Sequence, residues 1–201
     1  MTRIILASQS PRRKKLLEQI GLSFEVFPSK VEENSSQQNP ALLVEELALL
    51  KAREVSARFQ DSLVIGADTI VVHKGEIVGK PENEEEAAEF LTSLSNSTHT
   101  VYTGVALVKS DKKGHPESSH TFFEQTKVTF STLDEQDIHT YIKSGNPLDK
   151  AGAYGIQDDL GALFVERIEG DYYNVVGFPL NRFYRELKTF MPDLISMIVE
   201  Q

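Results

Sequence analysis

The chain has 201 residues, a length at which we expect a single domain over residues 1–201. Of these residues 40% are hydrophobic and 25% charged, a composition typical of a soluble globular protein. It has no cysteine, which excludes disulfide bonds and thiolate metal sites, and no apolar run that predicts a membrane span or a signal peptide, so we expect a cytoplasmic protein. A net charge of −9 argues against nucleic-acid polymers as partners, although a local group of cations can still bind a small anion.

A strand, a tight loop and a helix are predicted at the beginning of the chain. Residues 3–7 form a mainly apolar run of strand length. Ser10 is a suitable N-cap for the helix that follows, Pro11 suits its first position, and Gly21 suits its end.

The first turn of this helix has an unusual charge. Residues 12–15 are Arg-Arg-Lys-Lys, although the helix dipole is already positive there and disfavours cations. A later helix, predicted to begin near Asn83, carries glutamates at positions 84–86, as the dipole prefers. The contrast indicates that Arg12 and Arg13 bind an anion, and a polyphosphate fits a helix N-terminus that carries two arginines. The two lysines are better explained as solvated surface charges.

The helix predicted over residues 40–59 carries a cation on its apolar side. A predicted strand at residues 24–28 and a polar loop at residues 34–39 come before it. Lys51 falls within the apolar stripe of the helix, where its ammonium group needs an acceptor or must extend past the edge to water. The sequence leaves both explanations open.

The central stretch of the chain sets an acid within a buried strand. Residues 63–72 are apolar up to Gly66, and Asp68 and Thr69 then precede a second β-branched run. A buried carboxylate requires a partner, because its removal from water costs several kcal/mol. A turn in which Asp68 caps its own backbone is the alternative. The cations elsewhere in the sequence favour a functional carboxylate.

Further strands and helices are predicted in the second half of the chain. Thr132 and Glu135 match a capping box that opens a helix ending at Gly145. The other predicted elements are a hairpin turn at 74–76, strands at 99–109, 121–131 and 161–168, a polar loop at 110–119, and a helix at 179–190.

A glycine-rich loop is predicted at residues 149–157, which read Asp-Lys-Ala-Gly-Ala-Tyr-Gly-Ile-Gln. This segment contains too much glycine for a helix and is too polar for a strand in the core. We therefore expect a loop whose backbone approaches a ligand.

A series of motifs runs in order along nearly the whole chain. It consists of Ser8-x-Ser10-Pro11-Arg12-Arg13, Glu33, Lys51-Ala52, Gly66-Ala67-Asp68-Thr69, Gly79-Lys80-Pro81, the loop at 149–157, and Gly170-Asp171-Tyr172-Tyr173-Asn174-Val175-Val176-Gly177. Together these motifs resemble the Maf family of nucleoside triphosphate pyrophosphatases. Within that family they look like the branch that hydrolyses dTTP and UTP, rather than the branch that acts on 7-methyl-GTP.

The resemblance implies a fold and a cellular setting. It implies a mixed α/β fold like that of inosine triphosphatase, in which a long twisted mixed sheet is flanked by helices and two lobes surround a nucleotide-binding cleft. It also implies a cytoplasmic homodimeric enzyme that uses a divalent cation and has no membrane partner. Members of the family have been linked to the inhibition of septum formation.

The resemblance and the chemistry of the residues together imply a hydrolytic mechanism. Asp68 is the expected proton acceptor when water attacks the α-phosphorus, giving a nucleoside monophosphate and pyrophosphate. A carboxylate is a feeble base toward bulk water, so we predict that Mg²⁺ or Mn²⁺, bound by Glu33 and Asp68, is required. The triphosphate is expected to contact Ser8, Ser10, Arg12, Arg13, Lys51 and Lys80.

Base selection is assigned by the resemblance to Arg12, Thr69 and Gln157. A glutamine amide can accept a hydrogen bond from N3–H of uracil or thymine and donate one to O4. The same amide, rotated, would match cytosine, so CTP and modified pyrimidine triphosphates stay open as substrates. The alternative function is a nucleotide-binding regulator of cell division that acts through a partner without turnover.

Overall fold

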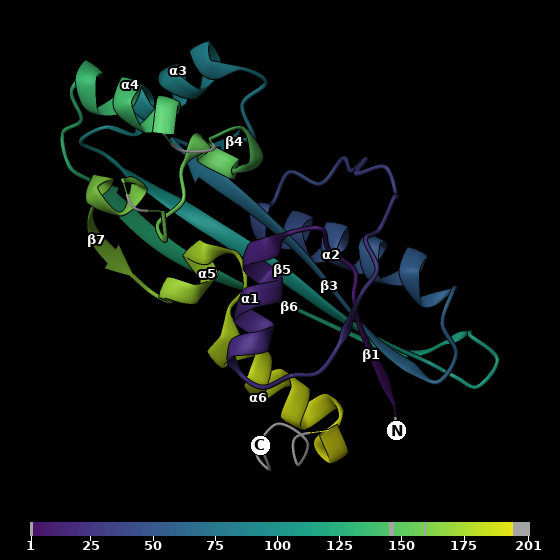
Figure 1. Ribbon diagram of the computed structural model, residues 1–201. Helices are drawn as coiled ribbons and strands as arrows, with labels where there is room; N and C mark the ends of the chain where they lie inside the picture. The colour runs from purple at the N-terminus through teal and green to yellow at the C-terminus, as the bar shows by residue number, and fades with distance from the viewer. Residues whose placement is uncertain (1, 145–146, 159, 195–201) are drawn as a thin grey trace. The chain divides into compact units, whose positions relative to one another are not determined.

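Strands and helices alternate along most of the chain in the computed structural model, which describes residues 2–144, 147–158 and 160–194 (Figure 1). The strands are β1 (Arg3–Leu6), β2 (Glu25–Val26), β3 (Ser62–His73), β4 (Glu76–Val78), β5 (Thr98–Ser110), β6 (Pro116–Phe130) and β7 (Val165–Glu169). The α-helices are α1 (Pro11–Gln19), α2 (Pro40–Ser56), α3 (Glu84–Leu94), α4 (Glu135–Ser144), α5 (Tyr172–Val176) and α6 (Leu180–Phe190). Short 3₁₀ turns are η1 (Pro147–Asp149), η2 (Ala151–Ala153), η3 (Gly161–Phe164) and η4 (Pro192–Leu194).

The strands of the described chain form one mixed sheet. Their order is β2-β1-β3-β5-β6-β7, with β4 paired to β3. β1 runs parallel to β2 and β3, with Ile5 opposite Val64, whereas β4 is antiparallel to β3 and β7 is antiparallel to β6. The predicted α/β fold with a mixed sheet and flanking helices is confirmed.

The described chain divides into two compact units. The first unit comprises residues 2–68, 103–124 and 177–194, and the second comprises the described residues of 69–102 and 125–176. The division falls within β3, so Asp68 and Thr69 are neighbours in the chain but belong to different units. The single domain and the nucleotide-binding cleft stay predictions.

Helix α2 packs directly on the sheet of the first unit. Ala48 and Ala52 of this helix belong to a buried cluster that also contains residues of the strands and their ends, namely Ile5, Ala7, Val64, Ala106 and Val108. A Cβ atom at Gly66 of β3 would fall on the carbonyl oxygen of Ala48, and one at Gly104 of β5 would fall on that of Val44. The two glycines therefore allow the helix backbone to lie against the strands.

The second unit contains a buried aromatic cluster and a pair of neighbouring helices, α3 and α4, which lie side by side (Figure 1). The Nε2 atom of His99 lies 2.8 Å from the hydroxyl of Tyr154, and the ring of Phe130 packs edge-on against both side chains. Burial lowers the pKa of His99 to about 3, so its imidazole is neutral at neutral pH.

The hairpin predicted at residues 74–76 is confirmed. Lys74 and Gly75 have φ angles of 51° and 87°, and His73 pairs with Glu76 across the turn. Two successive residues with positive φ match the twist of the flanking strands in a two-residue hairpin.

Several predicted strand boundaries were wrong. Residues 161–164 form the turn η3, because the N–H groups of Ala162 and Leu163 donate to nearby carbonyls of the same loop, and β7 begins only after it. β2 is limited to two residues instead of the predicted 24–28, and β6 begins inside the loop predicted at 110–119. A period-two pattern locates a strand better than it locates the strand's ends.

The cap of helix α4 also differs from the prediction. The carboxylate of Asp134, rather than the hydroxyl of Thr132, accepts a hydrogen bond from the N–H of Asp137 at 2.8 Å. Aspartate is one of the strongest N-cap residues, and it lies directly before the first helical residue, Glu135. The predicted helix end at Gly145 lies outside the described residues.

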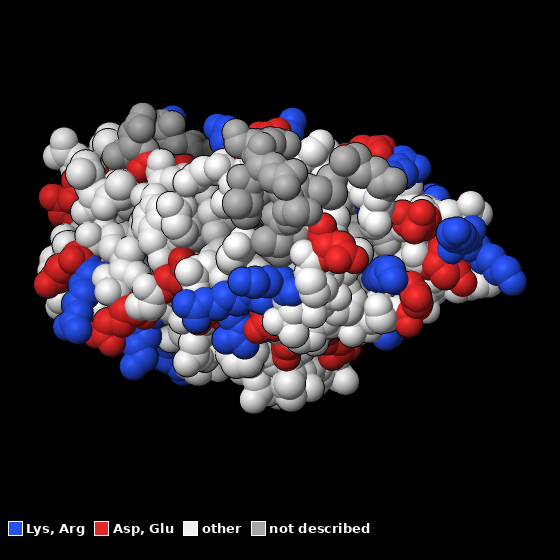
Figure 2. Space-filling view, turned by 90° about the horizontal axis from the view of Figure 1, so that it is seen from below, with Lys and Arg blue, Asp and Glu red and all other residues white. Residues whose placement is uncertain are grey.

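The surface in Figure 2 carries acidic and basic side chains interspersed with one another. The expectation that nucleic-acid polymers are not partners stays a prediction. Among the helices of the described ranges, none combines the length and apolar character needed to cross a lipid bilayer.

Candidate active site

A lysine and two carboxylates meet in the first unit. The Nζ atom of Lys51 lies 2.7 Å from Oδ1 of Asp68 and 2.9 Å from Oε1 of Glu33. The side chains of Lys51 and Asp68 are only 13% and 10% exposed, whereas that of Glu33 is 52% exposed. The Lys51 ammonium group therefore has carboxylate acceptors, so its side chain does not have to extend past the helix edge to water.

The packing of α2 on β3 brings this pair together. Gly66 lies two residues before Asp68, and its missing Cβ leaves room for the helix backbone at Ala48 and Ala52. These two alanines flank Lys51 on the buried side of the helix. The close approach of helix and strand therefore delivers the Lys51 ammonium to the Asp68 carboxylate.

Arg13 connects three segments of the first unit. Its Nε donates to the carbonyl of Gly177 at 3.0 Å, and its Nη1 donates to the Ser8 hydroxyl at 3.2 Å and to the Ala67 carbonyl at 2.9 Å. Burial lowers the pKa of Arg13, and the nearby charges of Asp68 and Glu33 oppose that shift. The guanidinium group thus braces the residue directly before Asp68.

The loop before α1 has the predicted cap geometry. The hydroxyl of Ser10 accepts from the N–H of Arg13 at 3.4 Å, and the hydroxyl of Ser8 accepts from the N–H of Ser10 at 3.2 Å. Arg12 is half-buried in the first turn of the helix. Ser8, Ser10, Arg12 and Arg13 therefore belong to one structured segment, and their contacts with phosphate stay predictions.

The carboxylates of Glu33 and Asp68 fit a divalent cation. Both lie at the same Lys51 nitrogen, so they are close neighbours. Mg²⁺ is commonly held by one or two carboxylates together with the phosphates of a substrate. No cluster of three or more potential metal ligands occurs in the part of the chain that the structure describes, and the metal requirement stays a prediction.

The second unit carries the other predicted site residues. Thr69 follows Asp68 directly in the chain, and the side chains of Lys80 and Gln157 are exposed. The N–H of Gly152 donates to the carbonyl of Gly79 at 2.9 Å. This bond joins the glycine-rich loop to the segment that carries Lys80, while the convergence of these residues on Asp68 stays a prediction.

The sequence analysis did not single out Lys150 within this loop or Asp158 directly after it. Lys150 is 7% exposed, and its Nζ lies 2.8 Å from Asp149 and 3.2 Å from Asp158. Asp158 also accepts a hydrogen bond from Nε2 of Gln157 at 2.9 Å. A lysine between an acid and a run of glycine and alanine was the available signal, but residue types alone do not reveal its partners.

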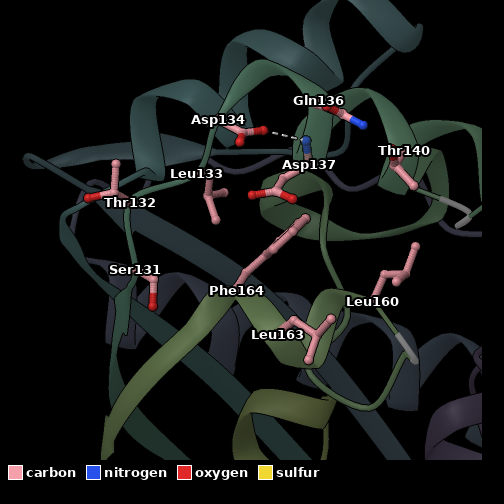
Figure 3. Close-up of a pocket in the computed structure, with 10 residues that line it drawn as sticks. All are labelled: Ser131, Thr132, Leu133, Asp134, Gln136, Asp137, Thr140, Leu160, Leu163 and Phe164. Carbon is pink, nitrogen blue, oxygen red and sulfur yellow. Dashed lines mark hydrogen bonds between the residues drawn. The ribbon is translucent and has the colours of Figure 1, made fainter.

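A pocket of about 410 Å³ opens elsewhere in the second unit (Figure 3). Its walls combine apolar side chains such as Leu163 and Phe164 with the acids Asp134 and Asp137. Leu163 is 72% exposed. No lysine or arginine is among its lining residues. A triphosphate would therefore meet negative charge there, so this pocket is unsuited to a nucleotide tail.

Two solved structures show a distant likeness to the chain. A HAM1 protein from Coxiella burnetii has a TM-score of 0.46 and 16% sequence identity over 66% of this chain and 75% of that chain. A nucleoside-triphosphatase / dITP/XTP pyrophosphatase from Mycobacterium abscessus has a TM-score of 0.46 and 13% identity over 95% of this chain and 100% of that chain.

The sequence comparisons give a closer match. A dTTP/UTP pyrophosphatase of Bacillus cereus (strain ATCC 10987 / NRS 248) is 52% identical over 96% of this chain and 93% of that protein. Proteins of the same name from Bacillus thuringiensis subsp. konkukian and Bacillus anthracis are 51% identical over 96% of this chain and 98% of each protein. The family model described as Maf-like protein matches residues 3–190, and the chain belongs to the Maf family.

Proposed function

We propose that this chain is a nucleoside triphosphate pyrophosphatase that hydrolyses dTTP and UTP to the monophosphate and pyrophosphate. The observation that carries the proposal is the contact of the Lys51 ammonium with the buried Asp68 carboxylate and with Glu33. Relatives in Bacillus that are 51–52% identical and named dTTP/UTP pyrophosphatase support it.

The cations of the first unit are proposed to bind the triphosphate. Lys51 and Arg12 carry the charge that neutralises the phosphate oxygens as negative charge develops on them. Arg13 has a second task, because its bonds to Ala67 and Ser8 hold the backbone beside Asp68 and the loop before α1 in position. Lys80 is proposed to supply a further phosphate contact from the second unit.

Asp68 is proposed to accept the proton of the attacking water. Its carboxylate is buried against Lys51, whose ammonium group holds it in a fixed direction. Glu33 and Asp68 would hold a Mg²⁺ or Mn²⁺ ion, which when bound would make the water more acidic and neutralise phosphate charge. Glu33, being half-exposed, is free of the packing constraints that fix Asp68 and can adjust to the ion.

Residues of the second unit, together with Arg12, are proposed to recognise the base of the nucleotide. Gln157 presents an exposed amide that can pair with the N3–H and O4 edge shared by uracil and thymine. Thr69 and Arg12 complete the set of specificity residues. Since both UTP and dTTP offer the same edge, one amide serves both substrates.

The experiment that tests this function is a pyrophosphate-release assay with separate nucleoside triphosphates and Mg²⁺. We expect release from UTP and dTTP and a loss of about 10³-fold or more in kcat for Asp68→Asn, with nucleotide binding retained. Asp61→Asn is the matched control, because it removes a carboxylate of the same unit at an exposed residue whose φ of 47° asparagine tolerates.

Binding of UTP without any release of pyrophosphate would favour the alternative, a nucleotide-binding regulator of cell division. Equal rates for the wild type and Asp68→Asn would remove Asp68 from the mechanism. A panel that includes CTP and pyrimidines with modified bases identifies the preferred substrate among the candidates that the sequence leaves open.

A further inference from the structure

The amide of Gln157 has a fixed neighbour in the next residue of the chain. Its Nε2 atom lies 2.9 Å from Oδ1 of Asp158. An ionised carboxylate can only accept hydrogen bonds, so the NH₂ group of the glutamine must face it and the carbonyl Oε1 must point elsewhere. The orientation of this amide is therefore determined by chemistry and not left to rotate freely.

The Asp158 carboxylate is itself held in place from several sides. Its Oδ2 atom accepts from the Tyr141 hydroxyl at 3.1 Å and lies 3.2 Å from Nζ of the buried Lys150. Burial and the charge of Asp158 raise the pKa of Tyr141, so the phenol stays protonated and remains a donor. The backbone N–H of Asp158 donates to the carbonyl of Gly155 at 3.0 Å, which fixes the main chain at the same point.

The glycine of this turn leaves the space that the pair needs. A Cβ atom at Gly155 would lie 2.8 Å from Nε2 of Gln157 and would also meet the Asp158 carboxylate. Any larger residue would therefore push the two side chains out of their present arrangement. The local backbone and the carboxylate together favour one rotamer of the glutamine amide.

We propose that Asp158 is a positioning residue that makes the site select uracil and thymine over cytosine by locking the amide of Gln157. With one N–H turned to Asp158, the amide presents Oε1 and its second N–H, which match the N3–H donor and the O4 acceptor of uracil and thymine. Cytosine requires the rotated amide, which would bring Oε1 against the Asp158 oxygen. This inference rests on the proposed function and deepens it.

The test compares UTP with CTP in wild type, Asp158→Asn and Gln157→Ala. The readouts are kcat/KM for both triphosphates and Kd for their non-hydrolysable α,β-imido analogues. In Asp158→Asn either amide orientation finds a partner, so we expect the UTP/CTP ratio of kcat/KM to fall by about tenfold or more through a gain for CTP. Glu135→Gln, which removes an exposed carboxylate of the same unit, should keep the wild-type ratio.

A double variant shows whether Asp158 acts through the glutamine. In the Gln157→Ala background, Asp158→Asn should cause no further change in the ratio. A wild-type ratio in Asp158→Asn, together with a reduced ratio in Gln157→Ala, would overturn the inference while leaving the proposed base reader intact. A protein that releases no pyrophosphate but binds the UTP analogue with an Asp158-dependent preference would overturn the proposed hydrolysis and uphold the inference.

Discussion

The carbonyl oxygen of Ala48 occupies the space that a Cβ atom would take at Gly66. Gly66→Ala must therefore separate helix α2 from strand β3 and move Lys51 away from Asp68. We expect the free energy of unfolding to fall by about 1–3 kcal/mol and the activity to fall with it. Denaturant unfolding followed by circular dichroism measures the first effect, and pyrophosphate release measures the second.

The control for this substitution is Gly79→Ala, since a Cβ atom there meets no atom within 4 Å. Its free energy of unfolding should stay within about 0.5 kcal/mol of the wild type. Equal stability of the two variants would show that α2 can shift without cost.

Lys51→Met keeps most of the side chain's bulk but removes its charge. We expect kcat/KM for UTP to fall about 10²-fold or more, because the ammonium group proposed to neutralise developing phosphate charge is lost. Lys15→Met, at an exposed lysine in the first turn of α1, should keep nearly full activity. If both variants turned over UTP at the wild-type rate, Lys51 would be only a structural partner of Asp68.

Arg13→Lys retains a positive charge but cannot form the three bonds to Ser8, Ala67 and Gly177. We expect a loss of about 2 kcal/mol or more in the free energy of unfolding, since buried acceptors lose a charged donor. The exposed Arg53→Lys on α2 should change stability by less than about 0.5 kcal/mol. Urea titration of both proteins makes the comparison, and two coincident unfolding curves would contradict the bracing role.

Glu33→Gln is expected to weaken the use of a divalent cation. The Mg²⁺ concentration for half-maximal activity should rise about tenfold or more, because one of the two carboxylates proposed to hold the ion is lost. Its neighbour Glu32→Gln, also exposed, serves as the control. Chelation of Mg²⁺ should abolish release in all three proteins, and activity that survives exhaustive chelation would refute the metal requirement.

The buried His99 predicts a pH dependence of stability. Its pKa is about 3 in the folded protein and near 6.5 in the unfolded chain, so the unfolded state binds more protons between these values. Stability contributed by the neutral imidazole is complete above pH 6.5 and is lost as the pH falls, by about 1.4 kcal/mol for each pH unit.

The wild type and His99→Phe should therefore differ in their pH profiles of unfolding. The free energy of unfolding of the wild type should fall more steeply between pH 6.5 and pH 5 than that of the variant. The exposed His139→Gln should retain the wild-type slope. Parallel profiles for the wild type and His99→Phe would show that the histidine titrates normally in the folded protein.

The sequence was sufficient to predict the features that depend on residue type and spacing. Lys51 was recognisable because it interrupts an apolar helical stripe, and Asp68 because it interrupts a β-branched strand. The structure joins these two side chains in one contact. The N-cap at Ser10 and the turn at Lys74 and Gly75 were predictable for the same reason, since local chemistry dictates both.

The remaining features depend on partners that are distant in the sequence or belong to the backbone. Arg13 binds carbonyl groups at positions 67 and 177, and a carbonyl leaves no trace in the sequence. The contacts of Lys150 and Tyr141 with Asp158 become visible only when the loop is folded. The turn at 161–164 was missed because an apolar run does not distinguish a 3₁₀ turn from a strand.

The charges around Arg13 predict how strongly a variant that lacks the Asp68 charge binds small anions. Its guanidinium group lies near Asp68 and Glu33, which together offset part of the positive charge of Arg12, Arg13 and Lys51. Neutralising Asp68 leaves the same cations with one countercharge fewer. An Asp68→Asn protein should therefore hold buffer phosphate or sulfate more tightly than the wild type, and crystals or titrations of it should be prepared in chloride.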